Sequence, residues 1–169
     1  IYKLSAWDIR NFPLIRRMAQ TGKPIQIDLG PSLIGELFTV MGELRKISRA
    51  QVTFLYSTHG EESDSNLRSI PHLQLVHGAR VGWSSPGRDF YIDGLAVAAG
   101  AKLVEKRLTL DGKADGHHNL LALEPDRFKK WVAHMRRTEE LMGEATLRPS
   151  LADLRGKDKY FTSIVANRD

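Results

Sequence analysis

The stretch TGKPIQIDLGPSLIGELFTVMGEL, residues 21–44, contains one complete strand-and-helix unit. Gly22-Lys23-Pro24 is a break, and residues 25–29 form a short apolar, β-branched run typical of a strand. Pro31 and Ser32 then open a helix whose apolar residues recur with the 3.6-residue period. Those apolar residues are Ile34, Leu37, Phe38, Met41 and Leu44. The stretch therefore predicts a strand followed by an amphipathic helix.

The same alternation continues on both sides of this unit. The other predicted strands are residues 2–7, 52–57, 80–84 and 102–108. The other predicted helices are residues 12–20, residues near 66–76, residues 91–99, and a last helix opened by Glu124-Pro125 and ended by Gly143. In the last helix we expect an inward face of Phe128, Trp131, Val132, Met135 and Met142. Consecutive βα units of this kind predict a parallel sheet with helices outside it.

This pattern alone leaves two α/β architectures open. One is a doubly wound open sheet of five strands, which a chain of this length could complete. The other is part of an eight-stranded barrel, which typically needs about 250 residues. Residues 144–158 are linker-like, and residues 160–166 read as the start of another strand.

Composition excludes several classes of protein. The 169 residues contain no cysteine, which excludes disulfides, zinc ribbons and thiol nucleophiles. No run approaches the roughly 20 apolar residues of a membrane span. The net charge is +5, but the lysines and arginines are scattered rather than clustered with aromatic residues, so we expect no nucleic-acid binding. The sequence predicts a cytoplasmic protein with a mild preference for anionic small substrates.

An ordered series of short motifs carries a family resemblance. The series includes YKL (2–4), NFPL (11–14), TGKPI (21–25), NLRSI (66–70), VGWS (81–84), AAGAKLVEK (98–106), LEP (123–125) and SIVA (163–166). In this order the motifs resemble the C-terminal five-eighths of the sialic acid (N-acetylneuraminate) synthase barrel. The resemblance implies a (β/α)8 TIM barrel of which about strands four to eight are present. It also implies a partial barrel domain over residues 1–143, a linker over 144–158, and the start of an antifreeze-like (SAF) domain at 159–169.

The resemblance implies a carbon–carbon bond-forming transferase of carbohydrate or surface polysaccharide biosynthesis. The family joins phosphoenolpyruvate to an N-acylated aldose of the N-acetylmannosamine type. In that reaction a divalent metal polarises the aldehyde, the enol carbon attacks it, water adds to the resulting cation, and phosphate leaves. The expected partners are therefore phosphoenolpyruvate and an amino sugar, and the family's homodimer is expected as well. A sequence of this kind is expected to be a portion of a longer polypeptide.

Several residues match substrate-binding positions of the family. Lys3 stands at the position of the phosphoenolpyruvate-binding lysine, and Ser84 at that of a serine that contacts the same molecule. Asp8 replaces a sugar-contacting glutamate, although it could equally be the N-cap of the following helix. Ser57 and Thr58, at the end of a predicted strand, are further candidate substrate-binding residues.

Other positions depart from the family. Arg107 and Pro86 occupy the places of the two metal-binding histidines, and since neither can ligate a metal, we expect no metal at the usual site. Asp28 stands where the family has a serine against the substrate's anionic groups. Two like charges about 4 Å apart cost on the order of 4 kcal/mol at an effective dielectric constant of 20. Glu61 replaces a sugar-binding tyrosine, and His118 replaces a residue of the family's Asp-His loop.

Glu105 matches the glutamate of the family's Glu-Arg-His run, and strand parity directs both Glu105 and Arg107 into the barrel. Arg107 could supply the cation that the metal usually supplies, or it could form a structural ion pair with Glu105.

Two alternatives to the synthase remain open. One is a degenerate relative that binds a sugar or sugar phosphate without turnover. The other is a metal-dependent barrel hydrolase with a relocated metal site, whose candidate ligands all follow predicted strand ends. These candidates are Asp28, His59, Glu61, His117 and His118.

Overall fold

The computed structural model describes residues 1–47, 51–116 and 118–162, and it contains one parallel sheet. The strands are β1 (Tyr2–Leu4), β2 (Ile25–Asp28), β3 (Val52–Tyr56), β4 (Val81–Ser84) and β5 (Val104–Glu105). The longer helices are α1 (Phe12–Gln20), α2 (Ile34–Ile47), α3 (Ser69–His77), α4 (Tyr91–Ala98), α5 (Pro125–Met142) and α6 (Leu151–Tyr160). Short 3-10 helices are η1 (Ala6–Asp8), η2 (Glu62–Ser65) and η3 (Asn119–Leu121).

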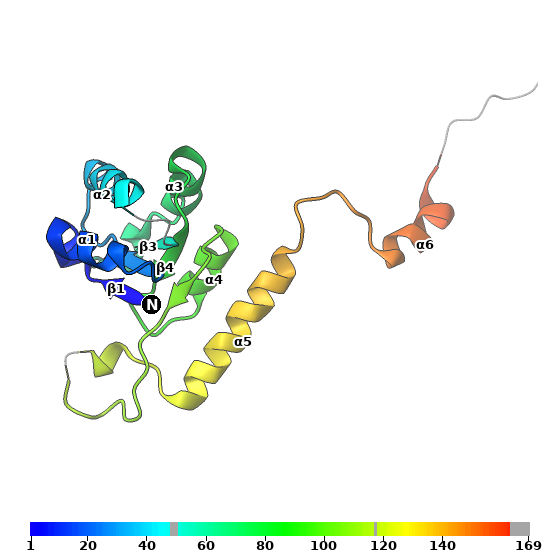
Figure 1. Cartoon of the computed structure of the whole chain (residues 1–169). Helices are drawn as coiled ribbons and strands as arrows, with labels where there is room; N and C mark the ends of the chain where they lie inside the picture. Colours follow the sequence, from blue (N-terminus) through cyan, green and yellow to red (C-terminus); the bar gives the residue numbers. More distant parts are fainter. Residues whose placement is uncertain (48–50, 117, 163–169) are drawn as a thin grey trace, which may run out of the picture.

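The order of the strands decides between the two architectures. In the sheet the strands lie in the order β1-β2-β3-β4-β5, so each strand pairs with the next one along the chain. A doubly wound sheet reverses its strand order at a switch point, whereas a barrel adds every strand in the same direction. Helices α1 to α4 lie around the outside of the sheet (Figure 1). The chain is therefore a segment of a TIM-type barrel, as expected.

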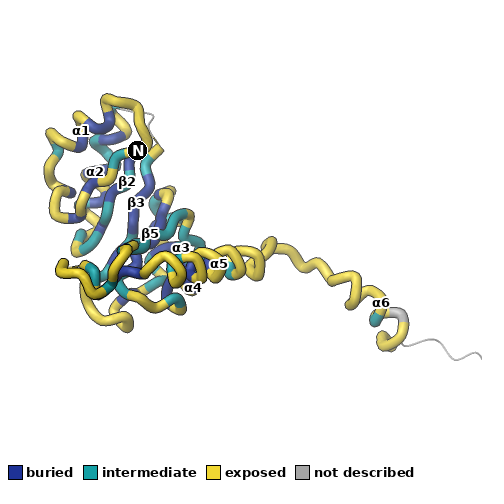
Figure 2. Tube along the Cα trace, turned by 90° about the horizontal axis from the view of Figure 1, so that it is seen from below, coloured by how far each residue is buried: buried dark blue, intermediate teal, exposed yellow. Residues whose placement is uncertain are grey.

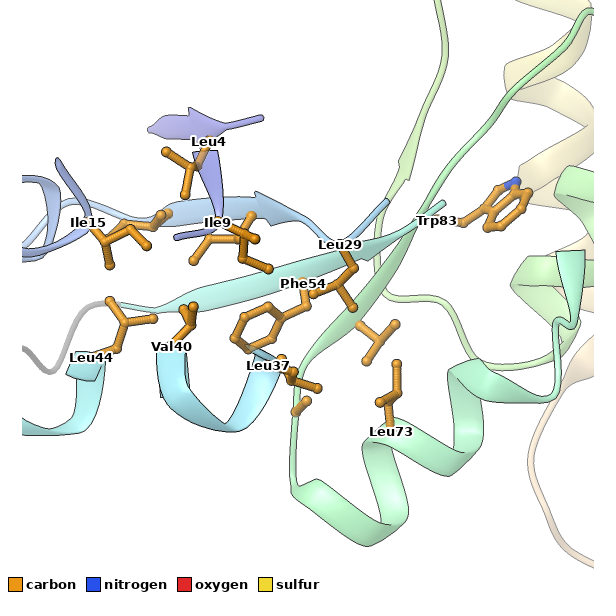
Figure 3. Close-up of a cluster of buried hydrophobic side chains, with 14 of the residues drawn as sticks. Leu4, Ile9, Ile15, Leu29, Leu37, Val40, Leu44, Phe54, Leu73 and Trp83 are labelled. Carbon is orange, nitrogen blue, oxygen red and sulfur yellow. The ribbon is translucent and has the colours of Figure 1, made fainter. Parts of the chain in front are cut away.

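The hydrophobic core lies between the sheet and its helices. Buried residues follow the middle strands of the sheet, whereas both residues of β5 are only partly buried (Figure 2). Figure 3 shows Phe54 and Leu29 facing Leu37 and Val40 of α2, with Leu73 of α3 beside them. Fully burying one such side chain contributes about 1.5–3 kcal/mol, so this layer stabilises the strands whose ends form the site.

Every strand is shorter than the sequence predicts, and two of them are shorter by more than one residue. The strand expected over residues 2–7 ends at Leu4, because Ser5 accepts a hydrogen bond from the Trp7 backbone N–H (3.4 Å) and caps η1. The strand expected over residues 102–108 is reduced to Val104–Glu105, which pairs with β4 on one side, and Leu108 forms an isolated bridge with Leu123.

Helix α5 buries less of its predicted inward face than expected. Trp131 and Met135 are buried and Phe128 is partly buried, but Val132 and Met142 are 39% and 53% exposed. The prediction was wrong for these last two. Helix α5 packs on α4, and its C-terminal half, which contains Met142, extends away from the sheet (Figure 1).

The segment after α5 contains a helix that the sequence did not predict. Helix α6 begins with a capping box in which Ser150 and Asp153 bond to each other's backbone N–H groups. The strand expected from Tyr160 is wrong at its first residue, since Tyr160 ends α6, and residues 163–169 lie outside the described residues. The linker and domain boundaries stay predictions. No helix in the described part of the chain is long and apolar enough to cross a membrane.

Glu36 links the start of α2 to the turn between η1 and α1. Its carboxylate accepts hydrogen bonds from the Leu33 backbone N–H (2.8 Å) and from Arg10 Nε (2.5 Å). The bond from Leu33, and then the one from Arg10, hold the pKa of the Glu36 carboxyl below its ordinary value of 4.5.

We therefore expect Glu36→Gln to lower the melting temperature at neutral pH. A depressed pKa gives stabilisation that is present above 4.5 and is lost as the pH falls through the folded-state value. The difference in melting temperature between wild type and variant should shrink across that acidic range. A difference that is the same at every pH would contradict this prediction.

Candidate functional site

A cavity of about 610 Å³ lies at the C-terminal ends of the strands. Each strand contributes a lining side chain at or near its C-terminal end. These side chains are Lys3 (β1), Asp28 (β2), Ser57 (just after β3), Ser84 (β4) and Glu105 (β5). In TIM-type barrels, active sites form at this face of the sheet. The structure thus brings together most of the residues that the sequence predicted for the site.

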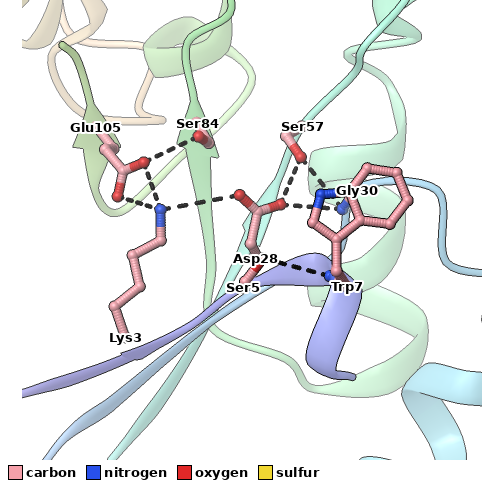
Figure 4. Close-up of polar contacts among 8 residues, drawn as sticks. All are labelled: Lys3, Ser5, Trp7, Asp28, Gly30, Ser57, Ser84 and Glu105. Atoms are coloured by element: carbon pink, nitrogen blue, oxygen red, sulfur yellow. Dashed lines mark hydrogen bonds and ion pairs between the residues drawn. The ribbon is translucent and has the colours of Figure 1, made fainter. Parts of the chain in front are cut away.

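Lys3 lies between two carboxylates (Figure 4). Its Nζ donates to both carboxylate oxygens of Glu105, and it lies 3.8 Å from Asp28 Oδ2. Ser84 Oγ donates to Glu105 Oε1 (3.1 Å), so β1, β2, β4 and β5 are joined through polar side chains. The Lys3 and Glu105 side chains are 36% and 35% exposed, so solvent and small molecules can reach the pair.

The Asp28 carboxylate accepts hydrogen bonds from a side chain and from the backbone. Its Oδ1 accepts hydrogen bonds from Ser57 Oγ (2.5 Å) and from the Gly30 backbone N–H (3.0 Å). Gly30 has φ +39°, and a Cβ there would lie 2.5 Å from the Cβ of Ala6, so a larger residue would disturb this turn. Because Lys3 and these donors face the Asp28 carboxylate, the repulsion expected between Asp28 and an anionic substrate is reduced.

Arg107 lines the cavity without pairing with Glu105. Its Nη1 donates to the Pro86 backbone carbonyl (2.9 Å), whereas Glu105 pairs with Lys3. The ion pair expected between Glu105 and Arg107 is therefore wrong. Within the described residues this carbonyl is the one hydrogen-bond partner of the guanidinium, which carries five N–H donors. Arg107 can therefore offer further donors to a ligand.

The two residues that the resemblance places at the family's metal position do not have side chains that fit a metal ion. Pro86 and Arg107 both line the cavity, and neither side chain can ligate a cation. The relocated site proposed from Asp28, His59, Glu61 and His118 shares the same cavity, while His117 lies outside the described residues. In the described ranges no three His, Asp or Glu side chains are grouped to hold a metal. The geometry gives the relocated site no support, and it stays a hypothesis.

Asp8 lies apart from the cavity, and it is not the helix N-cap that the sequence allowed. Thr58 and His118 line the cavity as expected, but Asp8 is exposed in η1 and is not among the lining residues. The N-cap of α1 is Asn11, whose side chain accepts from the Leu14 backbone N–H (3.3 Å), so the capping interpretation of Asp8 was wrong.

A buried polar cluster behind β5 was not predicted from the sequence. Lys106 Nζ donates to Asp93 Oδ2 (2.7 Å), and both side chains are fully enclosed. The Asp93 carboxylate also accepts from the indole N–H groups of Trp83 (2.9 Å) and Trp131 (2.8 Å). Burial lowers the pKa of the Lys106 amine, and Asp93 opposes that shift. Strand parity was the available signal, because it directs Lys106 away from the cavity toward an apolar helix that contains one aspartate.

Comparison with known proteins agrees with this geometry. The sequence model of the NeuB family matches residues 1–146. The chain is 28% identical to the N,N'-diacetyllegionaminic acid synthase of Campylobacter jejuni, covering 100% of this chain and 52% of that protein. It is also 28% identical to the N-acetylneuraminate-9-phosphate synthase of Mus musculus, covering 98% of this chain and 47% of that protein. The chain thus spans about half the length of the curated relatives it matches.

A solved structure shares both the fold and part of the sequence. The crystal structure of N-acetylneuraminic acid (sialic acid) synthetase from Leptospira borgpetersenii, in complex with citrate, superposes with a TM-score of 0.86 at 25% identity. The superposition covers 93% of this chain and 56% of that one. Since the family model covers most of the sequence, the strand order is that of a barrel, and the cavity lies at the expected strand ends, the chain belongs to the NeuB family.

Proposed function

We propose that the protein condenses phosphoenolpyruvate with an N-acylated amino sugar of the N-acetylmannosamine type, in carbohydrate biosynthesis. The observation that carries this proposal is the convergence of Lys3, Ser84 and Glu105 from three strands on one cavity. Relatives named as N,N'-diacetyllegionaminic acid and N-acetylneuraminate-9-phosphate synthases support the reaction class. The homodimer and the cytoplasmic location expected from the sequence belong to the same proposal.

Lys3 and Ser84 are the proposed contacts of the anionic donor. A lysine amine and a serine hydroxyl suit phosphate and carboxylate oxygens. Lys3 is paired with Glu105, but a partly exposed ion pair contributes only about 0–1 kcal/mol. An incoming phosphate can therefore exchange with Glu105 for the amine. Glu105, once released from Lys3, is a carboxylate next to the donor that can accept a proton from the water that adds during the reaction.

Arg107 is the proposed substitute for the family's metal. During the reaction the enol carbon of the donor forms a bond with the aldehyde carbon, and negative charge develops on the aldehyde oxygen. Arg107 lies in the cavity with donors to spare, so it can hydrogen-bond that oxygen. Water then adds to the cationic donor carbon, and the proton that it gives to Glu105 passes to the former aldehyde oxygen, which becomes a hydroxyl. The added hydroxyl loses its proton to the departing phosphate as the carbon–oxygen bond to phosphate breaks, which gives the keto acid.

A product assay tests this function. The protein is incubated with phosphoenolpyruvate and a panel of N-acylated hexosamines, with EDTA or with Mn²⁺, and released phosphate and products are measured. We expect a product with the mass of sugar plus phosphoenolpyruvate plus water minus phosphate, formed also with EDTA. Lys3→Met should abolish it. If none of the sugars gives this product, while the wild-type protein binds a sugar or phosphoenolpyruvate in calorimetry, the protein is a binding protein and not a synthase.

One observation favours that second candidate. Lys3 lies between Glu105 and Asp28, so the amine is already surrounded by negative charge. A relative that no longer turns over its donor would tolerate such pairing. It would bind a sugar or sugar phosphate without releasing phosphate.

A further inference from the structure

The strand end at β5 presents side chains to two opposite sides. Glu105 and Arg107 line the cavity, and Lys106 between them points to the other side, as alternation along a strand requires. The Lys106 side chain is fully enclosed and is not among the residues that line the cavity. Burying a lysine charge costs free energy unless the ammonium group is paired and hydrogen-bonded. The contacts of the Lys106 amine therefore indicate its role.

The Lys106 amine has three acceptors, all on the segment that follows β4. Nζ donates to Ser85 Oγ (2.7 Å), to the Asp89 backbone carbonyl (2.8 Å) and to Asp93 Oδ2 (2.7 Å). An ammonium group has three N–H donors, so each donor is used and the orientation of the group is fixed. Lys106 therefore connects the end of β5 to residues 85–93.

The same segment forms a wall of the cavity. Ser84, Ser85, Pro86 and Gly87 line it, and the Ser85 backbone N–H donates to the Glu105 carbonyl (3.0 Å). Arg107 holds this wall from the cavity side by donating to the Pro86 carbonyl. Lys106 and Arg107 therefore contact this segment from opposite sides, Arg107 from the cavity side and Lys106 from the other side.

Asp93 keeps Lys106 in place. Its carboxylate is fully buried and accepts from Lys106 and from the indoles of Trp83 and Trp131. Trp83 immediately precedes Ser84, so the cluster also fixes β4 next to the site. Bonds from β4, α5 and the end of β5 converge on this one carboxylate of α4.

We propose that Lys106 is a positioning residue of the site: it fixes the Ser85–Asp89 segment and thereby sets how Arg107 and Ser84 face the ligand. Only the identity of the ligand in this inference rests on the proposed function. The placement of the segment by Lys106 is a separate claim that can be measured without a ligand.

Hydrogen–deuterium exchange of the protein tests the placement, with Lys106→Met compared with Lys106→Arg and wild type. We expect exchange in the peptide spanning residues 84–90 to accelerate about tenfold or more in Lys106→Met, with β2 and β3 unchanged. Lys106→Arg, which keeps a buried cation, should restore most of the protection. Lys102→Met, which removes an exposed lysine near the same strand, should change nothing.

A second variant separates positioning from general loss of stability. Trp131→Phe removes one donor to Asp93 from α5 and should lower the melting temperature while leaving exchange at residues 84–90 slow. If Lys106→Met does not fold, Ser85→Ala removes one contact of the amine without burying a charge and should accelerate the same peptide. The proposal is overturned if a folded Lys106→Met shows unchanged exchange in residues 84–90. If Lys106→Met does not fold, unchanged exchange in Ser85→Ala overturns it. An equal acceleration in Trp131→Phe would overturn it as well.

A ligand measurement then connects the placement to the site. Phosphoenolpyruvate binding, followed by calorimetry, should weaken in Lys106→Met and recover in Lys106→Arg. If wild type fails to bind phosphoenolpyruvate, the proposed function is wrong while the exchange result still decides the placement. If binding is the same in wild type and Lys106→Met, Lys106 does not position the site.

Discussion

Replacing Asp93 with alanine is expected to lower the free energy of unfolding by about 3–5 kcal/mol, as for other buried ion pairs that lose one partner. The substitution leaves the enclosed Lys106 ammonium without its carboxylate and removes the acceptor of two buried indole N–H groups, those of Trp83 and Trp131. Native domains are stable by only about 5–15 kcal/mol, so this loss is a large part of the total. Urea denaturation followed by tryptophan fluorescence measures it.

The matched control is Asp126→Ala, which removes an exposed carboxylate from the first turn of α5. Its effect should stay near the roughly 0.5 kcal/mol of a surface substitution. In the double variant Asp93→Ala/Lys106→Met the loss should be smaller than the sum of the single losses, because no uncompensated charge remains. A loss below about 1.5 kcal/mol for Asp93→Ala alone, the value of one neutral hydrogen bond, would contradict a buried ion pair.

Hydrophobic periodicity predicted the position of every strand of the sheet and of the helices α1 to α5. It succeeded because each element buries one face against the sheet, and the apolar residues that do so, such as Ile27 and Val40, recur at the matching period. It could not predict the strand order, since a doubly wound sheet uses the same pattern. The family resemblance supplied the order, and the parallel neighbours β1 to β5 agree with it.

Element ends were predicted less well, because they depend on contacts outside the element. β1 ends at Leu4 through the cap that Ser5 provides, and β5 is short because it pairs with β4 on one side. Helix α5 exposes Met142 because its C-terminal half has no sheet beneath it, although the spacing of its apolar residues is that of a buried face.

The site residues were predicted through the family resemblance, but their partners were not. Lys3 lies near the start of the strand predicted over residues 2–7, so position along the strands alone would not have grouped it with Asp28 and Glu105. The pairing of Lys3 with Glu105 joins residues 102 positions apart, and no local pattern distinguishes it from the pairing of Glu105 with Arg107 that we expected. Because Lys3 takes the carboxylate, Arg107 keeps its donors for the cavity.

Arg107→Ala is therefore expected to lower kcat for the proposed condensation by about 10²–10³-fold, the loss typical of one donor to a developing oxyanion. The fold should survive, since the guanidinium is partly exposed and its one hydrogen-bond partner in the described chain, the Pro86 carbonyl, contributes about 1 kcal/mol. Arg107→Lys keeps the charge but loses the planar arrangement of donors, so its rate should lie between those of wild type and Arg107→Ala. Steady-state phosphate release with EDTA present measures all three.

The pair Pro86→His/Arg107→His supplies the complementary test, because it puts two imidazole ligands at the positions where the resemblance places the family's histidines. If Arg107 performs the metal's task, this double variant should be nearly inactive with EDTA and should recover activity with Mn²⁺, whereas wild type should respond little to either. Arg107→Ala with full wild-type activity in EDTA would show that the guanidinium takes no part in the reaction. Charge balance makes that outcome unfavourable: Lys3 and Arg107 are the cations that line the cavity among the described residues, and Lys3 already faces two carboxylates. Arg107 is therefore the cation with donors to spare for a negative charge that develops in this cavity.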